Sequence, residues 1–420
     1  MNFDDTPQEA AFRAQARAWI AANAPTHLHA ELESAGYGQS PLRSGDILAA
    51  SKAWQAAKHA AGWACLHWPK AYGGRGATPI ERVIWQQEEG AYAKLALVFL
   101  IGQGMCGPTL MAHAIEERHK LRYLPPLASG AEVWCQLFSE PAAGSDLAGL
   151  RTRAEQTSDG TGDWLINGQK IWTSGAHYCD YGIVLTRTDP NVAKHSGLTM
   201  FFIDMHSPGI EIRPIKQVNG QSGFNEVYFI DLRVPDHQRL GAVGDGWRVS
   251  LTTLMNERMS IGAGMVTGFS ELMDFCCDFD LADGRKAIDD PSVRSKLATW
   301  AVRTSGLRYT SYRSISALSK GQTPGPENSI GKLVAGQTLQ EVAAFGLDLQ
   351  GQAGIATDPT STEALGKFQA MLLRSPATRI EGGTDEILRN IIAERVLGLP
   401  ADMRADRGMP FNKIPSRVVG

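Results

Sequence analysis

The hydrophobic period of this chain changes twice along its length, and this change restricts the fold more than any other feature. Residues 1–130 and 241–400 show apolar side chains at the spacing of helices. Between residues 131 and 240 the apolar runs are short and separated by Pro and Gly turns, as in TMFFID, IEIRPI and VYFIDL. The pattern predicts a mostly α chain with a central β-barrel or compact sheet.

We therefore divide the chain into an N-terminal helical domain (1–130), a central β-barrel domain (131–240), a C-terminal helical bundle (241–400) and a tail (401–420). With 420 residues the chain is longer than one hydrophobic core usually supports, so several domains are expected. In the central domain, WLINGQKIW alternates around Asn167-Gly168. This dipeptide is typical of two-residue hairpin turns and predicts one there.

Composition excludes several classes of protein. The chain has 41 basic and 44 acidic residues and a net charge of −3, which argues against a nucleic-acid partner. Its six cysteines are scattered without a C-x-x-C pair, so neither a metal site nor a disulfide framework is indicated. The start of the chain lacks the apolar core of a secretory signal, and we find no 18-residue apolar stretch. These features predict a cytoplasmic protein without a membrane span.

The stretch GQGMCG, Gly102 to Gly107, matches the glycine spacing of dinucleotide-binding loops and follows the strand-like run ALVFLI. The surrounding pattern does not fit, because no alternation of strands and helices follows. The next acidic residues, Glu116 and Glu117, also come too early to contact a ribose. We do not expect a Rossmann domain.

The stretch LFSEPAAGSDLAG, Leu137 to Gly149, contains almost nothing that can fill a core. Its small residues would let backbone N–H groups and the hydroxyls of Ser139 and Ser145 approach a bound molecule closely. An ordinary surface turn has the same composition. The sequence leaves both readings open.

Two acidic residues are candidates for a catalytic base. In VSLTTLMNERMSIGAGMVTG, residues 249 to 268, the only charged residues are Glu257 and Arg258. We expect such an apolar segment to be buried, and burial raises the pKa of a carboxyl group as a general base requires. Glu381 precedes two glycines and Thr384, a good helix N-cap. A structural ion pair for Glu257 and a solvated loop for Glu381 are the alternatives.

With these segments in order, the sequence resembles the acyl-CoA dehydrogenase family from about residue 5 to residue 400. The resemblance is carried by YLPPLASGAEVWCQLFSEPAAGSDLAGLRTRAE, NGQKIWTS, the Glu257-Arg258 pair and EGGTDEILRNIIAERVLG. It implies an N-terminal helical domain, a central β-barrel and a C-terminal four-helix bundle. It also implies bound FAD and a homodimer or homotetramer.

The resemblance further implies which residues hold FAD and substrate. Ser139 and the Phe138 backbone would bond the flavin ring, and Trp172 would cover one of its faces. Ser145, Arg258 and Gly382 would meet the acyl-CoA substrate, where the backbone N–H of Glu381 or Gly382 donates to the thioester oxygen. The remaining positions implied to contact FAD are Gln136, Gly144, Ser145, Thr173 and Ser174 at the flavin, and Gln350, Gly351, Thr384 and Glu386 at the adenine half and pyrophosphate.

The implied reaction converts an acyl-CoA thioester into its 2,3-enoyl thioester and passes the electrons to an electron-transfer flavoprotein. Most relatives carry the base directly before the Gly-Thr of the glycine-rich loop, but EGGT contains one extra glycine and displaces Glu381. A smaller branch carries the base immediately before an arginine on a bundle helix, the position of Glu257. We favour Glu257 and keep Glu381 as the alternative.

One position departs from the family pattern. Where relatives have R-x-x-F-G, whose arginine reaches the flavin pyrophosphate of the partner subunit, this chain has DLADGRK with Asp280 four residues before Gly284. Arg285 is a possible substitute. The departure supports a second hypothesis, in which the chain is a non-catalytic or partner-dependent subunit of a mixed oligomer.

Overall fold

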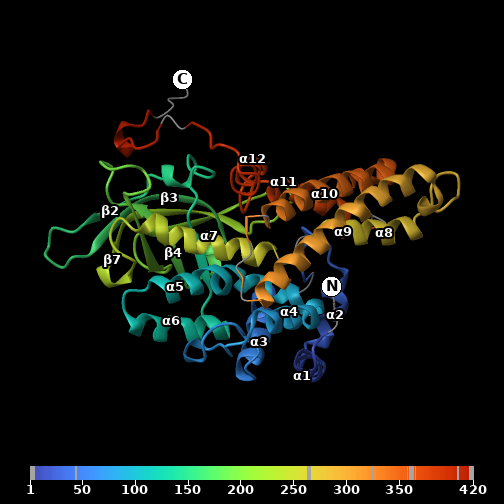
Figure 1. The fold of residues 1–420 in the computed structure, drawn as a ribbon, viewed down its shortest axis with the longest axis horizontal. Helices are drawn as coiled ribbons and strands as arrows, with labels where there is room; N and C mark the ends of the chain where they lie inside the picture. The colour runs from blue at the N-terminus through green and yellow to red at the C-terminus, as the bar shows by residue number, and fades with distance from the viewer. Residues whose placement is uncertain are drawn as a thin grey trace. The chain divides into compact units, whose positions relative to one another are not determined.

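The computed structural model describes the chain except residues 1–4, 43–44, 263–265, 321, 323–324, 327, 357, 359–363, 365, 404–405 and 416–420. The chain forms two compact units, each built from segments that are distant in sequence (Figure 1). The helical unit contains Met1–Ile47, Thr78–Leu95 and Arg258–Ala401. The sheet unit contains Leu48–Ala77, Ala96–Glu257 and Asp402–Gly420.

The helical unit is built from helices of both ends of the chain. Figure 1 shows α8, α9, α10 and α11 side by side, and α9 and α11 both pack on α10. Their shared core includes Leu272, Trp300, Val342 and Phe368. The helices of this unit are α1 (Pro7–Asn23), α2 (His29–Ser34), α4 (Pro79–Glu88), α8 (Phe269–Asp278), α9 (Pro291–Ser319), α10 (Asn328–Leu349), α11 (Lys367–Thr378) and α12 (Asp385–Ile391).

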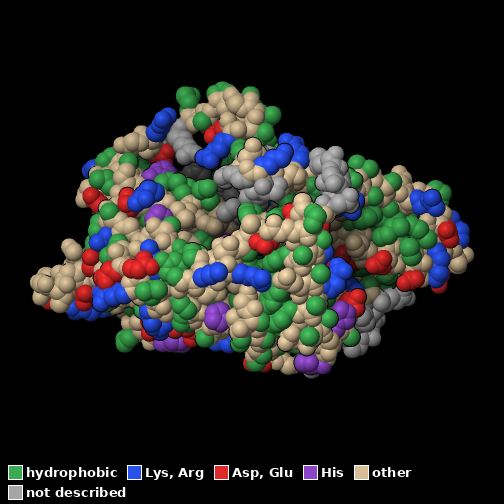
Figure 2. All heavy atoms as spheres, turned by 60° about the horizontal axis from the view of Figure 1, so that its bottom comes forward, with side chains coloured by type: hydrophobic (Ala, Val, Ile, Leu, Met, Phe, Trp, Pro, Cys, Tyr) green, Lys and Arg blue, Asp and Glu red, His purple; other side chains and the backbone are tan. Residues whose placement is uncertain are grey.

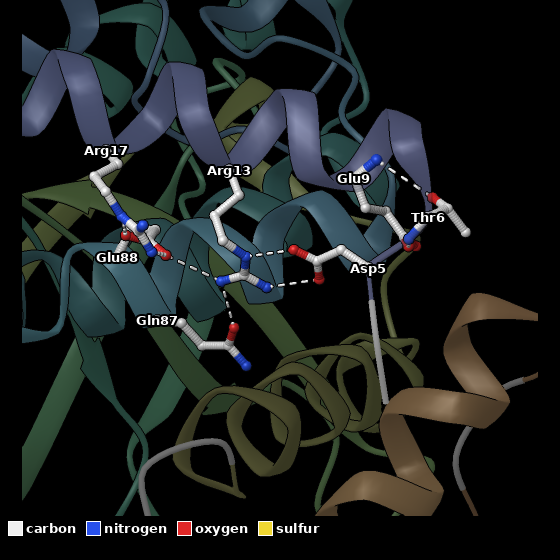
Figure 3. A network of polar contacts seen from close by, with 7 residues as sticks. All are labelled: Asp5, Thr6, Glu9, Arg13, Arg17, Gln87 and Glu88. Atoms are coloured by element: carbon white, nitrogen blue, oxygen red, sulfur yellow. Dashed lines mark hydrogen bonds and ion pairs between the residues drawn. The ribbon is translucent and has the colours of Figure 1, made fainter. Parts of the chain in front are cut away.

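Helices α1 and α4 begin with the same capping box and are then joined by charged side chains. In α1 the hydroxyl of Thr6 accepts from the N–H of Glu9, whose carboxylate accepts from the N–H of Thr6. Figure 3 shows Arg13 of α1 reaching Glu88 of α4, with Nη1 to Oε1 at 3.1 Å. Arg17 reaches the same carboxylate at 2.9 Å. These contacts fix the two helices to each other within the helical unit.

The sheet unit contains one eight-stranded sheet in the order β6-β7-β3-β2-β4-β5-β8, with β1 paired to β4. Hydrogen bonds do not join β6 to β8 among the described residues, so the ladder is open and the predicted barrel is not confirmed. The strands are β1 (Trp134–Leu137), β2 (Arg153–Gln156), β3 (Trp164–Ser174), β4 (Tyr181–Arg187), β5 (Leu198–Asp204), β6 (Ile210–Ile215), β7 (Phe224–Val234) and β8 (Arg239–Leu240).

Both faces of the central strands are buried. Ile183 and Phe202 belong to one apolar cluster, while Val184 and Phe201 belong to another on the opposite face. This arrangement explains why strands β4 and β5 read as nearly continuous apolar runs instead of alternating ones. The helices of the sheet unit are α3 (Ile47–Ala60), α5 (Gly107–His113), α6 (Glu117–Ser129) and α7 (Gly246–Gly262), whose last turn enters the helical unit.

The predicted hairpin turn at Asn167-Gly168 is wrong. Strand β3 continues through both residues and pairs with β7 along most of its length, with a register shift between Ile166 and Gly168. A side chain at residue 168 would meet Thr152 at 2.5 Å, and its φ is +151°. Glycine is therefore required here by a bulge and a close backbone approach.

The strand-like run ALVFLI does not form a strand. The chain forms a 3-10 stretch over Gly90–Phe99, and Gly102–Cys106 is a π-helical turn that leads into α5. A Cβ at Gly107 would meet the Trp68 indole at 2.3 Å, so this glycine serves packing. As expected, no dinucleotide loop forms here.

Two further expectations concern surfaces. Within the described ranges, no single helix has the length and apolar character needed to cross a membrane; the segments Gly90–Phe99 and Gly102–His113 meet this test only jointly, with a 73° bend.

Figure 2 shows acidic and basic side chains interspersed over the face that it draws. Among the coloured residues of that face, basic side chains do not form the kind of patch that binds a polyanion.

Candidate functional site

A buried ion pair holds the start of the small-residue loop to strand β3. The ammonium group of Lys170 donates to the carbonyl of Phe138 and to Oε1 of Glu140, both at 2.9 Å. The Glu140 carboxylate also accepts from the backbone N–H groups of Arg151 (2.6 Å) and Thr152 (2.9 Å). These contacts therefore fix the start of the loop that follows β1.

This pair lies away from solvent, with Lys170 0% and Glu140 7% exposed. Burial lowers the pKa of Lys170. Burial also acts to raise the pKa of Glu140, but the Lys170 charge and the hydrogen bonds to the carboxylate outweigh it and place that pKa below its usual value. The favoured state is an ionised carboxylate facing an ammonium group.

The sequence analysis did not predict this ion pair, although the sequence contained a signal for it. Trp164, Ile166 and Lys170 all occupy buried positions of β3, so a lysine stands where the strand points apolar side chains into the core. Charged residues are almost never fully buried without a partner. The partner, Glu140, is 30 residues earlier, and pairing across that separation depends on sheet register.

Two polar atoms beside the loop are buried without a hydrogen-bond partner among the described residues: Oε1 of Gln136 on β1 and Oγ1 of Thr173 on β3. Native proteins satisfy nearly all buried polar groups, so such exceptions indicate a water or ligand. Both residues are predicted to contact the flavin. A cofactor with donors and acceptors along its ring edge fits these positions.

Trp172, directly before Thr173 on β3, has an unusual backbone conformation. Its φ is +61°, at the register shift between Lys170 and Thr173, and its side chain is 55% exposed beside Phe224. A bulky residue at positive φ costs about 1–3 kcal/mol and persists where the surrounding structure requires it. The bulge turns the indole outward. An indole that stacks on a flavin ring needs such an exposed orientation.

The tip of the small-residue loop is exposed, whereas the predicted contacts at its start and at the end of β3 are half-buried. Gly144 and Ser145 are exposed, and a Cβ at Gly144 would have no neighbour within 4 Å. Ser139 and Ser174 are half-buried, and the carbonyl of Ser139 accepts from the N–H of Ile171 at 2.9 Å. The loop therefore presents small groups on a rigid base.

Glu257 lies on α7 beside the same region of the sheet unit. Its Oε2 is 3.5 Å from Nε2 of Gln136. Thr253, one turn earlier on the same helix face, contacts Thr109 of α5 at 2.9 Å, and Thr252 contacts His113 at 2.8 Å. These contacts position the helix and place its carboxylate against the Gln136 side chain.

The expected full burial of this segment is wrong. Leu251 and Met255 are exposed, and Glu257 is half-buried. An apolar run does not bury every face of a helix when the unit covers only one of them. The side chain of Arg258, predicted to meet the substrate, lies outside the described residues.

Glu381 lies in the helical unit and is engaged by an arginine. Nη2 of Arg374 is 2.8 and 2.7 Å from the two carboxylate oxygens. The following glycines, Gly382 and Gly383, have φ values of +64° and +102°. Thr384 caps α12 as predicted, accepting from the N–H of Ile387 at 3.2 Å. The loop is built as expected, but its acid already has a cationic partner.

The positions predicted for the adenine half of FAD also belong to the helical unit. Gln350 donates to the carbonyl of Gly346 at 2.8 Å, and its Oε1 is buried without a hydrogen-bond partner among the described residues. Gly351 has φ +56°, a Cβ added to it would have no neighbour within 4 Å, and Glu386 is exposed. An acceptor left unsatisfied beside an open glycine fits a bound polar group.

At the departure from the family pattern, both charged residues are paired locally. Asp280 accepts from Lys286 at 2.8 Å. Arg285 contacts Asp283 at 2.7 Å and Asp290 at 3.3 Å, and remains half exposed. The turn after α8 is therefore held by its own ion pairs.

Family models match nearly the whole chain. Residues 6–131 match the N-terminal domain of acyl-CoA dehydrogenases, residues 135–232 the middle domain and residues 244–397 the C-terminal domain.

Individual proteins agree with the family models. The chain is 37% identical over 401 residues to the acyl-CoA dehydrogenase IpdE1 of Mycolicibacterium smegmatis, covering 94% of this chain and 98% of that protein. It is 38% identical to FadE34 of Mycobacterium tuberculosis, covering 80% of this chain and 44% of FadE34. Among solved structures, the ChsE4-ChsE5 complex from Mycobacterium tuberculosis superposes with a TM-score of 0.77 at 27% identity, covering 96% of this chain and 100% of that chain. A structure described as the Tcur3481-Tcur3483 steroid ACAD gives 0.77 at 26% identity, with 96% and 100% covered.

Proposed function

Since this chain belongs to the acyl-CoA dehydrogenase family, whose members are FAD-dependent oxidoreductases, we propose that it oxidises a CoA thioester to the 2,3-enoyl thioester with Glu257 as the base. The observation that carries this assignment is the Glu257 carboxylate 3.5 Å from Gln136, whose own Oε1 is buried without a hydrogen-bond partner among the described residues. A candidate base and a predicted flavin contact thus adjoin in one compact unit.

The residues that would hold FAD are those implied by the family resemblance. In the sheet unit, Gln136, Phe138, Ser139 and Trp172 to Ser174 would contact the flavin ring. The same resemblance implies that Gln350, Gly351, Thr384 and Glu386 contact the adenine half and pyrophosphate. When bound, FAD supplies the acceptor for the hydride that leaves the β-carbon of the substrate. The unsatisfied acceptors of Gln136 and Gln350 support this placement.

The chain itself supplies the base and the substrate contacts. Glu257 would take the α-proton. The family resemblance implies that the backbone N–H of Glu381 or Gly382 donates to the thioester oxygen, on which enolate charge develops. Arg374 donates to both oxygens of the Glu381 carboxylate, so this acid is already bound by a cation, and we therefore favour Glu257. Ser145 would lie near the acyl chain.

For the acyl group we propose a steroid-derived or similarly bulky thioester. Two structures similar to this chain at 26% identity, one of them a variant form, are described as steroid ACADs, with TM-scores of 0.77 and 0.75. An electron-transfer flavoprotein would accept the electrons.

The test is anaerobic bleaching of flavin absorbance in the purified protein against a panel of thioesters. The panel contains a short straight, a branched, a long straight and a steroid side-chain acyl-CoA. We expect the steroid thioester to reduce the flavin fastest. Equal or faster reduction by a short straight chain would contradict the proposed substrate class, and hydrogen peroxide formed in air during turnover would contradict the proposed acceptor.

Trp172→Ala is expected to raise the dissociation constant of FAD by about 2- to 12-fold, the equivalent of an aromatic stacking contact of about 0.5–1.5 kcal/mol. Because the indole is 55% exposed, we expect the melting temperature of the FAD-free protein to remain close to that of the unaltered chain. Titration with FAD followed by flavin fluorescence measures the first quantity. An unchanged dissociation constant would show that the indole does not stack on the ring.

A second candidate function is a subunit that is active only with a partner chain. It is favoured by Asp280, an acid paired to Lys286 where relatives carry a pyrophosphate-binding arginine, and by the similarity to a chain of the ChsE4-ChsE5 complex. On this hypothesis the chain purified alone is colourless and does not reduce flavin with any thioester of the panel. A yellow, active homo-oligomer would exclude it.

A further inference from the structure

Asp406–Ile414, part of the last described segment of the chain, lies along the turn between β4 and β5 in the sheet unit. Pro410 forms an isolated bridge with Ala193, and the N–H of Phe411 donates to the carbonyl of Val192 at 2.8 Å. The N–H of Asn412 donates to the carbonyl of Pro190 at 2.9 Å. Figure 1 shows this red end of the chain beside the sheet. We call Asp406–Ile414 the strap.

Lys194 joins the strap to the small-residue loop. Its ammonium group contacts both carboxylate oxygens of Asp146, at 2.8 and 2.9 Å, and a carboxylate oxygen of Asp406. The Lys194 side chain is 10% exposed, so these contacts are shielded from bulk water more than an ordinary surface pair. One lysine thus holds an acid of the loop and an acid of the strap together.

Arg187 makes a second connection at the end of the same loop. Its guanidinium donates to the carbonyls of Ala148 (2.6 Å), Leu150 (3.1 Å) and Lys194 (3.2 Å). The Phe411 ring covers it, with the guanidinium carbon 3.5 Å from the ring centroid. Burial lowers the pKa of Arg187 to about 10, so the group stays charged at neutral pH and attracts the ring face.

We propose that the strap positions the small-residue loop for ligand binding, with Phe411 and Asp406 acting as positioning residues through Arg187 and Lys194. This inference rests on the proposed function in one respect, that the loop lines the flavin and the acyl chain. The family models end at residue 397, so the strap lies beyond the part of the chain that they match.

The loop needs such support because its tip has little packing of its own. Gly144 and Ser145 are exposed, and the side chain of Asp146 is 62% exposed. Ala143 and Leu147 reach the core, while the carbonyls of Ala148 and Leu150 are held by Arg187. If the strap is released, the loop samples conformations that do not bind ligand, and apparent affinity falls in proportion to the fraction that remains competent.

The experiment compares Phe411→Ala and Asp406→Asn with the unaltered full-length protein. Hydrogen exchange followed by mass spectrometry reports the loop amides of residues 143–150, without FAD or substrate. We expect exchange there to rise by about 10- to 30-fold in Phe411→Ala, the equilibrium equivalent of a desolvated cation–π contact. Phe411→Tyr, which keeps the ring, and Lys413→Ala, whose side chain is exposed on the strap, serve as controls and should leave exchange unchanged.

Steady-state kinetics and FAD titration then test whether the strap affects ligand binding. For Phe411→Ala, KM for the acyl-CoA and the dissociation constant of FAD should both rise by the factor by which the competent fraction of the loop falls. The value of kcat should stay within about two-fold, because the loop contacts ground and transition state alike. Unchanged exchange at residues 143–150 would overturn the proposal that the strap positions the loop. Raised exchange with unchanged KM and FAD affinity would overturn its role in ligand binding. If no thioester reduces the flavin of the unaltered protein, the proposed function fails. The exchange experiment still tests whether the strap positions the loop.

Discussion

Glu257→Gln is expected to lower the rate of flavin reduction by acyl-CoA by about 10²- to 10⁴-fold, the usual contribution of a general base. Glutamine retains the shape and the capacity to bond Gln136 but cannot take the α-proton. The variant should remain yellow and should bind acyl-CoA with nearly unchanged affinity, because the substitution removes an interaction of the transition state only. Anaerobic stopped-flow absorbance measures the reduction rate.

Glu381→Gln is the matched control. It replaces the other candidate carboxylate by the same neutral group, and it weakens the contact with Arg374. We expect this variant to reduce flavin within about ten-fold of the unaltered protein and to show its main effect on the stability of the helical unit. If Glu381→Gln is the inactive variant and Glu257→Gln is not, the base has been assigned to the wrong residue.

Lys170→Met is expected to destabilise the sheet unit by about 3–5 kcal/mol, because it leaves the Glu140 carboxylate buried and uncompensated. It also removes the donor that holds the Phe138 carbonyl at 2.9 Å, so FAD should be retained poorly even by the folded fraction. Urea unfolding, followed by tryptophan fluorescence, measures the free energy of unfolding, and flavin content per chain measures the second effect.

Two controls separate the buried pair from a general loss of charge. Lys286→Met removes an exposed lysine paired to Asp280, and it should cost less than about 1 kcal/mol. The double variant Glu140→Leu with Lys170→Met removes both buried charges, and it should be more stable than Lys170→Met alone. A loss below about 1 kcal/mol in Lys170→Met would show that the pair is not the anchor described here.

Elements with local causes could be predicted from the sequence. The apolar runs TMFFID, IEIRPI and VYFIDL became strands β5, β6 and β7, and Thr384 caps α12 as its position before Asp385 and Glu386 indicated. These outcomes depend on short apolar runs bounded by turn residues and on a hydroxyl three residues from an N–H group. Both are properties of a few neighbouring residues, and the family motifs carry the same local information.

The failures have one physical cause. Asn167-Gly168 has the composition of a hairpin turn, yet β3 passes straight through it because pairing with β7 and the close approach of Thr152 favour a bulge. The apolar sequence around Glu257 suggested full burial, yet the unit covers only part of that helix. In both cases the outcome depended on which distant segments cover the residues, and a local pattern does not specify this.

The order of helices and strands, the family and the candidate acids follow from the chain read alone, since periodicity, caps and motifs are encoded within short windows. Folding supplied the rest: Glu140 meets Lys170 across 30 residues, Gln136 meets Glu257 across 121, and Asp406 reaches Asp146 through Lys194. Such meetings depend on strand register and on which segments share a compact unit. Those are properties of the whole chain, because they result from many weak contacts acting together.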